Sequence, residues 1–159
     1  MAVWHFKFAL VPKEVIVSVC GGMVKRLPEY SGEGRGDEVL DGFPNYWLGG
    51  KSIELLLDRA SRLLPEIESW TSEARMFGCK DGDRIEVWED DVLCYLDLRK
   101  LSLSLLEGII YLAASSDCSL VLFGSGEVVE PELPLVVEKI KESNAFAFCV
   151  DPASFFAGL

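Results

Sequence analysis

The chain has 159 residues, of which 50% are hydrophobic and 26% are charged, and its formal net charge is -11 at pH 7. This composition is typical of one globular domain and excludes a disordered chain. The negative excess repels nucleic acid and attracts basic surfaces, so we expect a protein partner with a basic surface and no nucleic acid.

The N-terminal third predicts two strands and a loop. Residues 4–11 alternate between large apolar and other side chains, which is typical of a strand with one buried face. Residues 14–20 are apolar and rich in β-branched side chains, which predicts a second strand. Residues 28–50 are rich in glycine and show no period. We expect an irregular loop there, whose aromatic end at Tyr46 and Trp47 folds back onto the core.

The middle of the chain predicts a helix and a hairpin. Residues 52–64 place apolar side chains at the helical period, and Ser52 is a natural N-cap. Residues 84–88 and 92–99 each alternate, and they flank an acidic triplet whose aspartates tolerate turn conformations. These two segments therefore predict an antiparallel β-hairpin.

The C-terminal part predicts two more helices and two strands. Residues 104–115 and 132–143 carry helical apolar patterns. Residues 118–123 are apolar without alternation, as a strand buried on both faces is, and residues 145–150 predict a last strand. Hairpin and crossover connections both occur, which favours a mixed sheet. The prediction is an α+β fold, in which residues 1–159 form a single-domain α/β sandwich with about three helices packed on a mixed β-sheet.

The cysteines indicate a reducing compartment. Cys20, Cys79, Cys94, Cys118 and Cys149 are scattered and form no C-x-x-C pair, which favours free thiols in the cytoplasm over a disulfide framework. A metal site would need distant cysteines to converge, because the chain has a single histidine, so we expect no metal and no cofactor. No apolar stretch approaches the roughly 18 residues of a membrane span, so we expect no membrane contact and a cytoplasmic location.

The acidic segment 81–91 is the candidate site for a partner. A tryptophan at position 88 sits among its carboxylates, and an exposed tryptophan in that setting is a plausible hot spot for an arginine- or lysine-rich surface. The alternative is a solvated hairpin whose tryptophan lies under the glycine-rich loop. The candidate partner-binding residues are Asp81, Asp83, Glu86, Trp88, Glu89, Asp90, Asp91, Tyr46 and Trp47.

Catalytic and metal-binding interpretations of this region fail on spacing. An EF-hand calcium loop that began at Asp81 would need glycine at its sixth position and glutamate at its twelfth, where the chain has Glu86 and Val92. A metal-dependent nuclease would place a lysine two residues after an acidic residue, but Asp97 is followed there by Arg99. We therefore predict no catalytic residue and no metal ligand.

Short segments spread over the chain resemble small acidic bacterial immunity proteins of polymorphic toxin systems. The segments are 4–12, 46–49, 64–70, 77–88, 96–99 and 149–156. The resemblance implies a protein that is not an enzyme, binds a cognate toxin tightly and occludes its active site. Two alternatives stay open: a regulatory or adaptor module with another partner, and an enzyme whose site is assembled from scattered residues such as Asp97, Arg99 and Tyr46.

Overall fold

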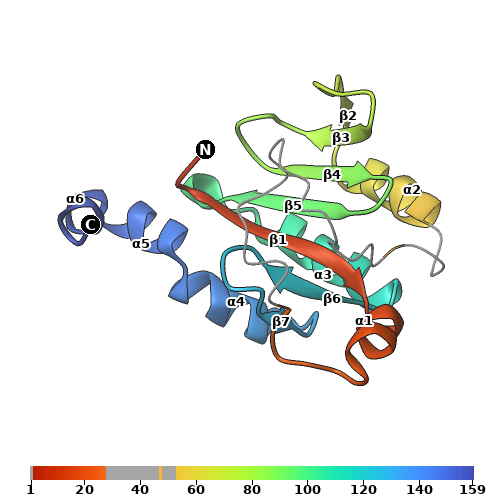
Figure 1. The fold of residues 1–159 in the computed structure, drawn as a ribbon. Coiled ribbons are helices and arrows are strands. Elements are labelled where there is room, and N and C mark those ends of the chain that lie inside the picture. The colour runs from red at the N-terminus through yellow and green to blue at the C-terminus, as the bar shows by residue number, and fades with distance from the viewer. Residues whose placement is uncertain (1, 28–46, 48–52) are drawn as a thin grey trace.

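The computed structural model describes residues 2–27, 47 and 53–159. Within these residues seven strands form one sheet in the order β2-β3-β4-β5-β1-β6-β7 (Figure 1). The strands are β1 (His5–Pro12), β2 (Glu66–Ile67), β3 (Ala74–Gly78), β4 (Arg84–Trp88), β5 (Val92–Asp97), β6 (Cys118–Leu122) and β7 (Val128–Val129). The helices are α1 (Lys13–Cys20), α2 (Ile53–Leu63), the 3-10 helix η2 (Leu98–Lys100), α3 (Leu103–Ser115), α4 (Leu133–Glu142), α5 (Asn144–Val150) and α6 (Pro152–Ala157).

The α+β class is confirmed, but the expected mixed sheet is wrong because every strand pair is antiparallel. The crossover through α3 does join two strands that run in the same direction, β5 and β6. However, β1 lies between them and pairs with both, so that Phe8 stands opposite Cys94 on one side and Leu122 on the other. The crossover therefore creates no parallel pair.

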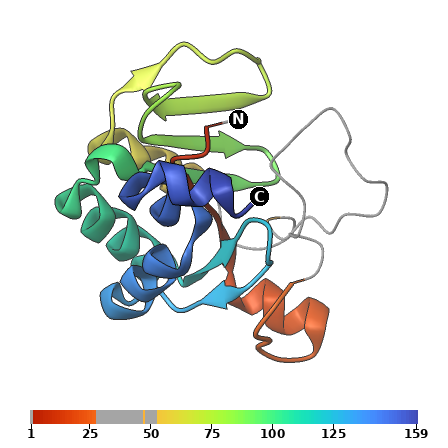
Figure 2. The ribbon, with the colours of Figure 1, turned by 90° about the vertical axis from the view of Figure 1, so that its left-hand side faces the viewer.

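The sheet separates two apolar layers. Figure 2 shows α2, α3 and α4 on one side of the sheet, with α1 on the other. On the side of the three helices, Phe8, Leu96 and Leu106 are fully buried in the main core cluster. On the opposite side a smaller cluster gathers Ile16 of α1 with Val121 and other sheet residues. Both faces of the central strands are consequently covered.

Three predicted helices are confirmed as α2, α3 and α4, but the expected total of about three is wrong because the described residues form six α-helices. The segment predicted as a second strand is α1, which ends where Gly21 adopts a left-handed conformation at φ 78°. The predicted last strand is α5, and its N-cap Ser143 accepts a hydrogen bond from the backbone of Phe146. In α1 and α5, helix caps and packing therefore outweigh the local preference for a strand.

The tail also forms a helix, α6. Asp151 is its N-cap, and Pro152 occupies its first turn. Strands β2 and β3 were not predicted. No helix within the described ranges is long and apolar enough to span a lipid bilayer.

All five cysteines are free thiols, and they differ in exposure. Cys20 and Cys79 are exposed, whereas Cys94 and Cys118 are buried, and burial raises the pKa of the Cys94 thiol. We expect a thiol-alkylating reagent to modify the two exposed cysteines in the folded protein and the two buried ones only after unfolding. Peptide mass spectrometry counts the labels at each site. Fast labelling of Cys94 under native conditions would contradict its burial.

Candidate binding site

Aromatic and charged side chains form a ladder across the sheet face that is turned away from α2, α3 and α4. Its central members come from adjacent strands, because the register places Arg84 of β4 opposite Tyr95 of β5, and Asp97 of β5 opposite His5 of β1. Side chains alternate between the two faces along a strand, so these residues share one face. The ladder is defined by Trp4, His5, Trp70, Arg84, Tyr95, Asp97 and Arg99.

One end of the ladder is a buried arginine between two rings. The guanidinium carbon of Arg84 lies 3.9 Å from the ring centroid of Tyr95 and 5.1 Å from that of Trp70. Its Nε is 3.5 Å from an oxygen of Glu86, and both side chains are buried. Burial and the Glu86 carboxylate raise the pKa of the Tyr95 phenol. The paired charges and stacked rings hold this end of the ladder in one arrangement.

The other end is an arginine clamped by a buried carboxylate. Asp97 is fully buried, and its two oxygens accept hydrogen bonds from Nε of Arg99 at 2.9 Å and from Nη2 at 2.7 Å. The bonds from Arg99 hold the pKa of Asp97 below its usual value. The guanidinium lies over the Trp4 ring at 4.0 Å from the centroid. Such a two-point pair fixes the orientation as well as the position of the arginine.

The turn between β3 and β4 connects the start of β1 with the end of β5 through hydrogen bonds. The carbonyl of Asp81 accepts hydrogen bonds from the Trp4 indole at 3.4 Å and from Arg99 at 3.3 Å. The carboxylate of Asp83 accepts one from the Asp97 backbone at 2.8 Å. At the surface, Trp70 is 55% exposed and the Arg99 side chain is 45% exposed. This end of the sheet therefore presents an exposed tryptophan and a fixed arginine to solvent.

The predicted exposure of two acidic-segment residues is wrong, and for Trp88, whose exposed and covered states both stayed open, the structure shows partial burial. Glu86 and Asp91 are buried, and Trp88 is half-buried against the smaller core cluster. Glu86 pairs with Arg84, and Asp91 accepts a hydrogen bond from the Val92 backbone at 2.9 Å. Both carboxylates are therefore engaged inside the protein, and neither is exposed to a partner.

The other predicted residues do not form one patch. Asp81 and Asp83 precede β4, whereas Glu89 and Asp90 follow it, and a strand of that length separates its ends by about 13 Å. Asp81 and Glu89 are exposed. The acidic segment thus contributes to two separate surfaces.

Trp47 does fold back onto the core, as expected, but as an interior residue. It is 6% exposed, and its indole donates a hydrogen bond to the Leu10 carbonyl at 3.2 Å. This burial corrects its expected role as a surface contact. Tyr46 lies outside the described residues.

Four residues of the ladder were not predicted as site residues: Trp4, Trp70, Arg84 and Tyr95. A signal was present in the hairpin, because its two strands place charged or phenolic side chains at alternate positions, Arg84 with Glu86 and Tyr95 with Asp97. Alternation of this kind on both partners indicates a polar network on one face. No local signal connects Trp70 or Trp4 with that face.

His5 lies in the middle of the ladder, and we expect it to make the stability of the protein depend on pH. It is 8% exposed, and burial followed by the charge of Arg84 lowers its pKa from the ordinary value of 6.5. The unfolded chain then binds more protons than the folded protein below pH 6.5. We expect the free energy of unfolding to fall as pH drops from 6.5 toward the lowered pKa.

Urea unfolding of the wild type and His5→Gln at several pH values checks this expectation. Because the chain has one histidine, the variant should lose the pH dependence above the range in which carboxylates titrate. An unchanged slope in His5→Gln would mean that another group is responsible.

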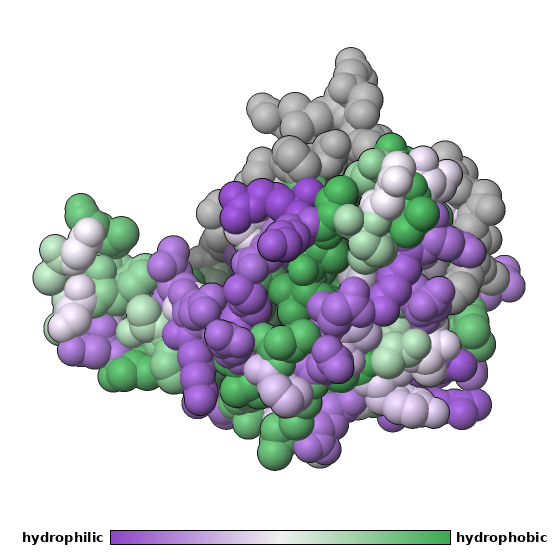
Figure 3. All heavy atoms as spheres, turned by 90° about the horizontal axis from the view of Figure 1, so that it is seen from below, coloured by the Kyte–Doolittle hydropathy of each residue, from purple (hydrophilic) through white to green (hydrophobic). Residues whose placement is uncertain are grey.

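A second exposed surface is apolar. Figure 3 shows hydrophobic residues gathered on the C-terminal helices, which project from the body of the molecule. Val150 is 67% exposed, Phe156 56% and Leu159 86%. Phe148 packs edge-on against Phe155 and Phe156 and joins α5 to α6. This surface is mainly apolar, whereas the ladder holds several fixed charges that can orient a partner, so the ladder is the stronger candidate site.

The ladder uses its charged groups to hold aromatic rings in place. The buried carboxylates of Glu86 and Asp97 are each paired with an arginine. Within the described ranges, no three His, Cys, Asp or Glu side chains are grouped closely enough to hold a metal ion. Tryptophan, tyrosine and arginine are the residues enriched at the energetic centres of protein interfaces.

No family model, curated protein or solved structure matches this chain.

Proposed function

We propose that this chain binds and neutralises a partner protein, the cognate toxin of a bacterial polymorphic toxin system, by covering its active site. The observation that carries the proposal is the half-exposed Trp70 held over Arg84, together with Arg99 clamped by buried Asp97 at the other end of the ladder. Rings and guanidinium groups that are already fixed lose little freedom when a partner docks, which favours tight binding. The contact would occur in the cytoplasm, where free thiols persist.

We infer that the chain catalyses no reaction of its own. A general base must reach a proton of its substrate, but the Asp97 carboxylate is fully buried and accepts hydrogen bonds from the Arg99 guanidinium and backbone. Glu86 is likewise buried against Arg84. These contacts weigh against the alternative of an enzyme site around Asp97 and Arg99.

The net charge of -11 supports a basic partner surface. Long-range attraction accelerates encounter, whereas the stacked residues of the ladder govern how long the complex lasts. We expect the association rate constant to fall about tenfold or more as salt rises from about 0.1 M to 1 M, because the screening length shrinks from about 10 Å to about 3 Å. Stopped-flow fluorescence with the purified partner measures it. A salt-independent association rate would contradict a basic partner.

The function itself is tested by identifying the partner. The tagged protein is purified from its native host, the bound chain is identified, and that chain is expressed in cells with and without this protein. We expect growth arrest without it and normal growth with it. A bound chain that is harmless when expressed alone would favour a regulatory or adaptor role. Turnover of a substrate by the purified protein, abolished by one side-chain change, would overturn the binding function.

A further inference from the structure

The C-terminal helices α5 and α6 form an arm that projects from the body of the molecule (Figure 1). Along the described length of these two helices, Ala145 alone is buried. A helix of six residues, such as α6, is too short to be stable in water unless other parts of the structure pack against it. We name residues 144–157, which comprise α5 and α6, the C-terminal arm.

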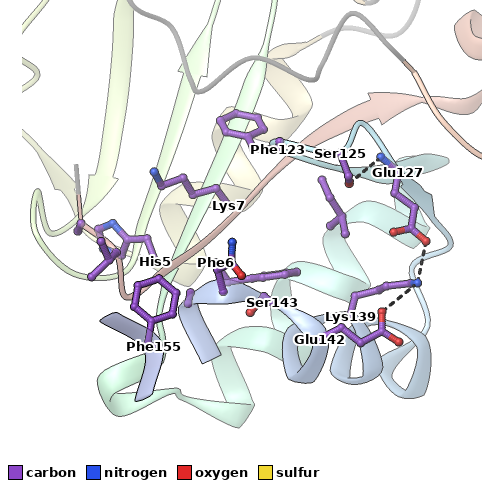
Figure 4. Close-up of a pocket in the computed structure, with 16 residues that line it drawn as sticks. His5, Phe6, Lys7, Phe123, Ser125, Glu127, Lys139, Glu142, Ser143 and Phe155 are labelled. Atoms are coloured by element: carbon purple, nitrogen blue, oxygen red, sulfur yellow. Dashed lines mark hydrogen bonds and ion pairs between the residues drawn. The ribbon is translucent and has the colours of Figure 1, made fainter. Parts of the chain in front are cut away.

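One side of the C-terminal arm packs against the body. Helix α5 contacts η2 and β1. In α6, Phe155 is half-buried and lines a pocket beside β1 together with His5 and Phe6 (Figure 4). The Phe148 ring lies edge-on to the rings of Phe155 and Phe156, with centroids 5.8 and 5.7 Å apart. These ring contacts hold α5 and α6 together.

The other side of the C-terminal arm is apolar and exposed. Val150 and Phe156 are both more than half exposed. Two further exposed leucines, Leu101 and Leu103, follow η2, the helix that α5 contacts. A gathering of large apolar side chains on the surface of a soluble chain marks an interaction site.

The C-terminal arm and the residues beside it carry no net charge, in contrast to the rest of the chain. The formal charge of -11 therefore belongs to other parts of the sequence. A basic protein is attracted to those parts, whereas a second copy of this acidic chain is not repelled at the arm. Residues 97–103 and 138–159 hold four cations and four anions, which are Arg99, Lys100, Lys139, Lys141, Asp97, Glu138, Glu142 and Asp151.

The size of this surface suits a contact between two copies. A stable interface uses about 20 to 30 residues of each partner. Helices α5 and α6 supply seven and six residues, and the adjoining segment 98–103 brings the surface to about the lower end of that range. In a two-fold dimer both copies use the same patch, so an apolar patch is complementary to itself.

We propose that the C-terminal arm is the contact between two copies of this chain, which pack arm against arm about a two-fold axis with Val150 and Phe156 at the centre. The second copy covers the side of α6 that faces away from the body and so stabilises this short helix. This contact is separate from toxin neutralisation, because it uses the arm and not the exposed Trp70.

Sedimentation equilibrium of the purified chain measures the association. We expect the average mass to rise with protein concentration from 17.6 kDa, the mass of one chain, toward twice that value. Val150→Glu should raise the dissociation constant of the dimer at least about tenfold, because it would bury carboxylates between apolar surfaces. Val19→Glu is the matched control, since it makes the same change at an exposed valine of α1 and should leave the dissociation constant unchanged. Circular dichroism confirms that both variants are folded.

The salt dependence of the wild type tests the contact without any substitution. Two copies with a charge of -11 each repel one another through surfaces outside the arm, and salt screens this repulsion. We expect the dissociation constant of the dimer to fall about threefold or more as salt rises from about 0.05 M to about 0.5 M. The sign is opposite to that expected for association with a basic partner.

A wild-type chain that stays monomeric at every protein and salt concentration would overturn the proposal, as would equal effects of the two valine substitutions. So would an association that weakens with salt, because opposite charges would then hold the copies together. If a partner protein covers the arm instead, the wild type stays monomeric and Val150→Glu weakens binding of that partner. Trp70→Ala should leave the dimer unchanged, so failure of this contact and failure of the ladder are distinguishable.

Discussion

Replacing Trp70 with alanine should weaken the complex with the neutralised partner by about 2 kcal/mol, roughly a 30-fold increase in the dissociation constant. The ring is 55% exposed and lies 5.1 Å from the Arg84 guanidinium and 5.5 Å from the Lys80 ammonium. It is therefore available to a partner while already being held in place. The loss should appear mainly as faster dissociation, because contact residues act on residence time more than on encounter.

Tyr111→Ala is the matched control for this measurement. Tyr111 is 73% exposed on α3, on the other side of the sheet from the ladder, so its removal should leave the dissociation rate unchanged. Surface plasmon resonance with the purified partner compares the two variants. Equal effects of both substitutions, or no effect of Trp70→Ala, would show that the partner docks elsewhere.

Replacing Asp97 with alanine should lower the free energy of unfolding by about 3 kcal/mol. The carboxylate is fully buried, pairs with the Arg99 guanidinium and caps the first residues of η2. Its loss leaves a cation beside Trp4 without its partner. The Arg99 side chain is 45% exposed and can be hydrated, so we expect the lower end of the range known for broken buried pairs.

Asp81→Ala is the control for that variant. Its exposed side chain accepts a bond from Cys79, but its contacts with Trp4 and Arg99 use the backbone carbonyl, which alanine retains. Urea unfolding at neutral pH should separate the two variants clearly. Equal losses would mean that the carboxylate of Asp97 contributes little.

The same pair determines part of the acid sensitivity. Arg99 lowers the pKa of Asp97 in the folded protein, so the pair stabilises the fold above the unfolded value of about 3.9 and loses this effect as pH falls through the folded pKa. Asp97→Ala should lose that part of the acid dependence.

The sequence by itself determined the elements whose periodic pattern is strong and local. The helix predicted over 52–64 is α2 (Ile53–Leu63), and the hairpin predicted from alternation is β4 and β5. Each pattern repeats over several turns or residue pairs, so the burial of one face alone is enough to select the structure. The five scattered cysteines likewise correspond to free thiols.

Tertiary structure decided the conformation of the short apolar segments and which residues form the site. The segments of α1 and α5 are too short to show a period, so their caps and neighbours selected helix over strand. Alternation placed Glu86 and Trp88 on the face opposite the main core, but whether that face is wet depends on elements far along the chain. Trp4 and Arg99 meet only because β1 inserts beside β5, and the Asp81 carbonyl in the β3–β4 turn accepts hydrogen bonds from both. Such contacts follow from strand order, which no local pattern encodes.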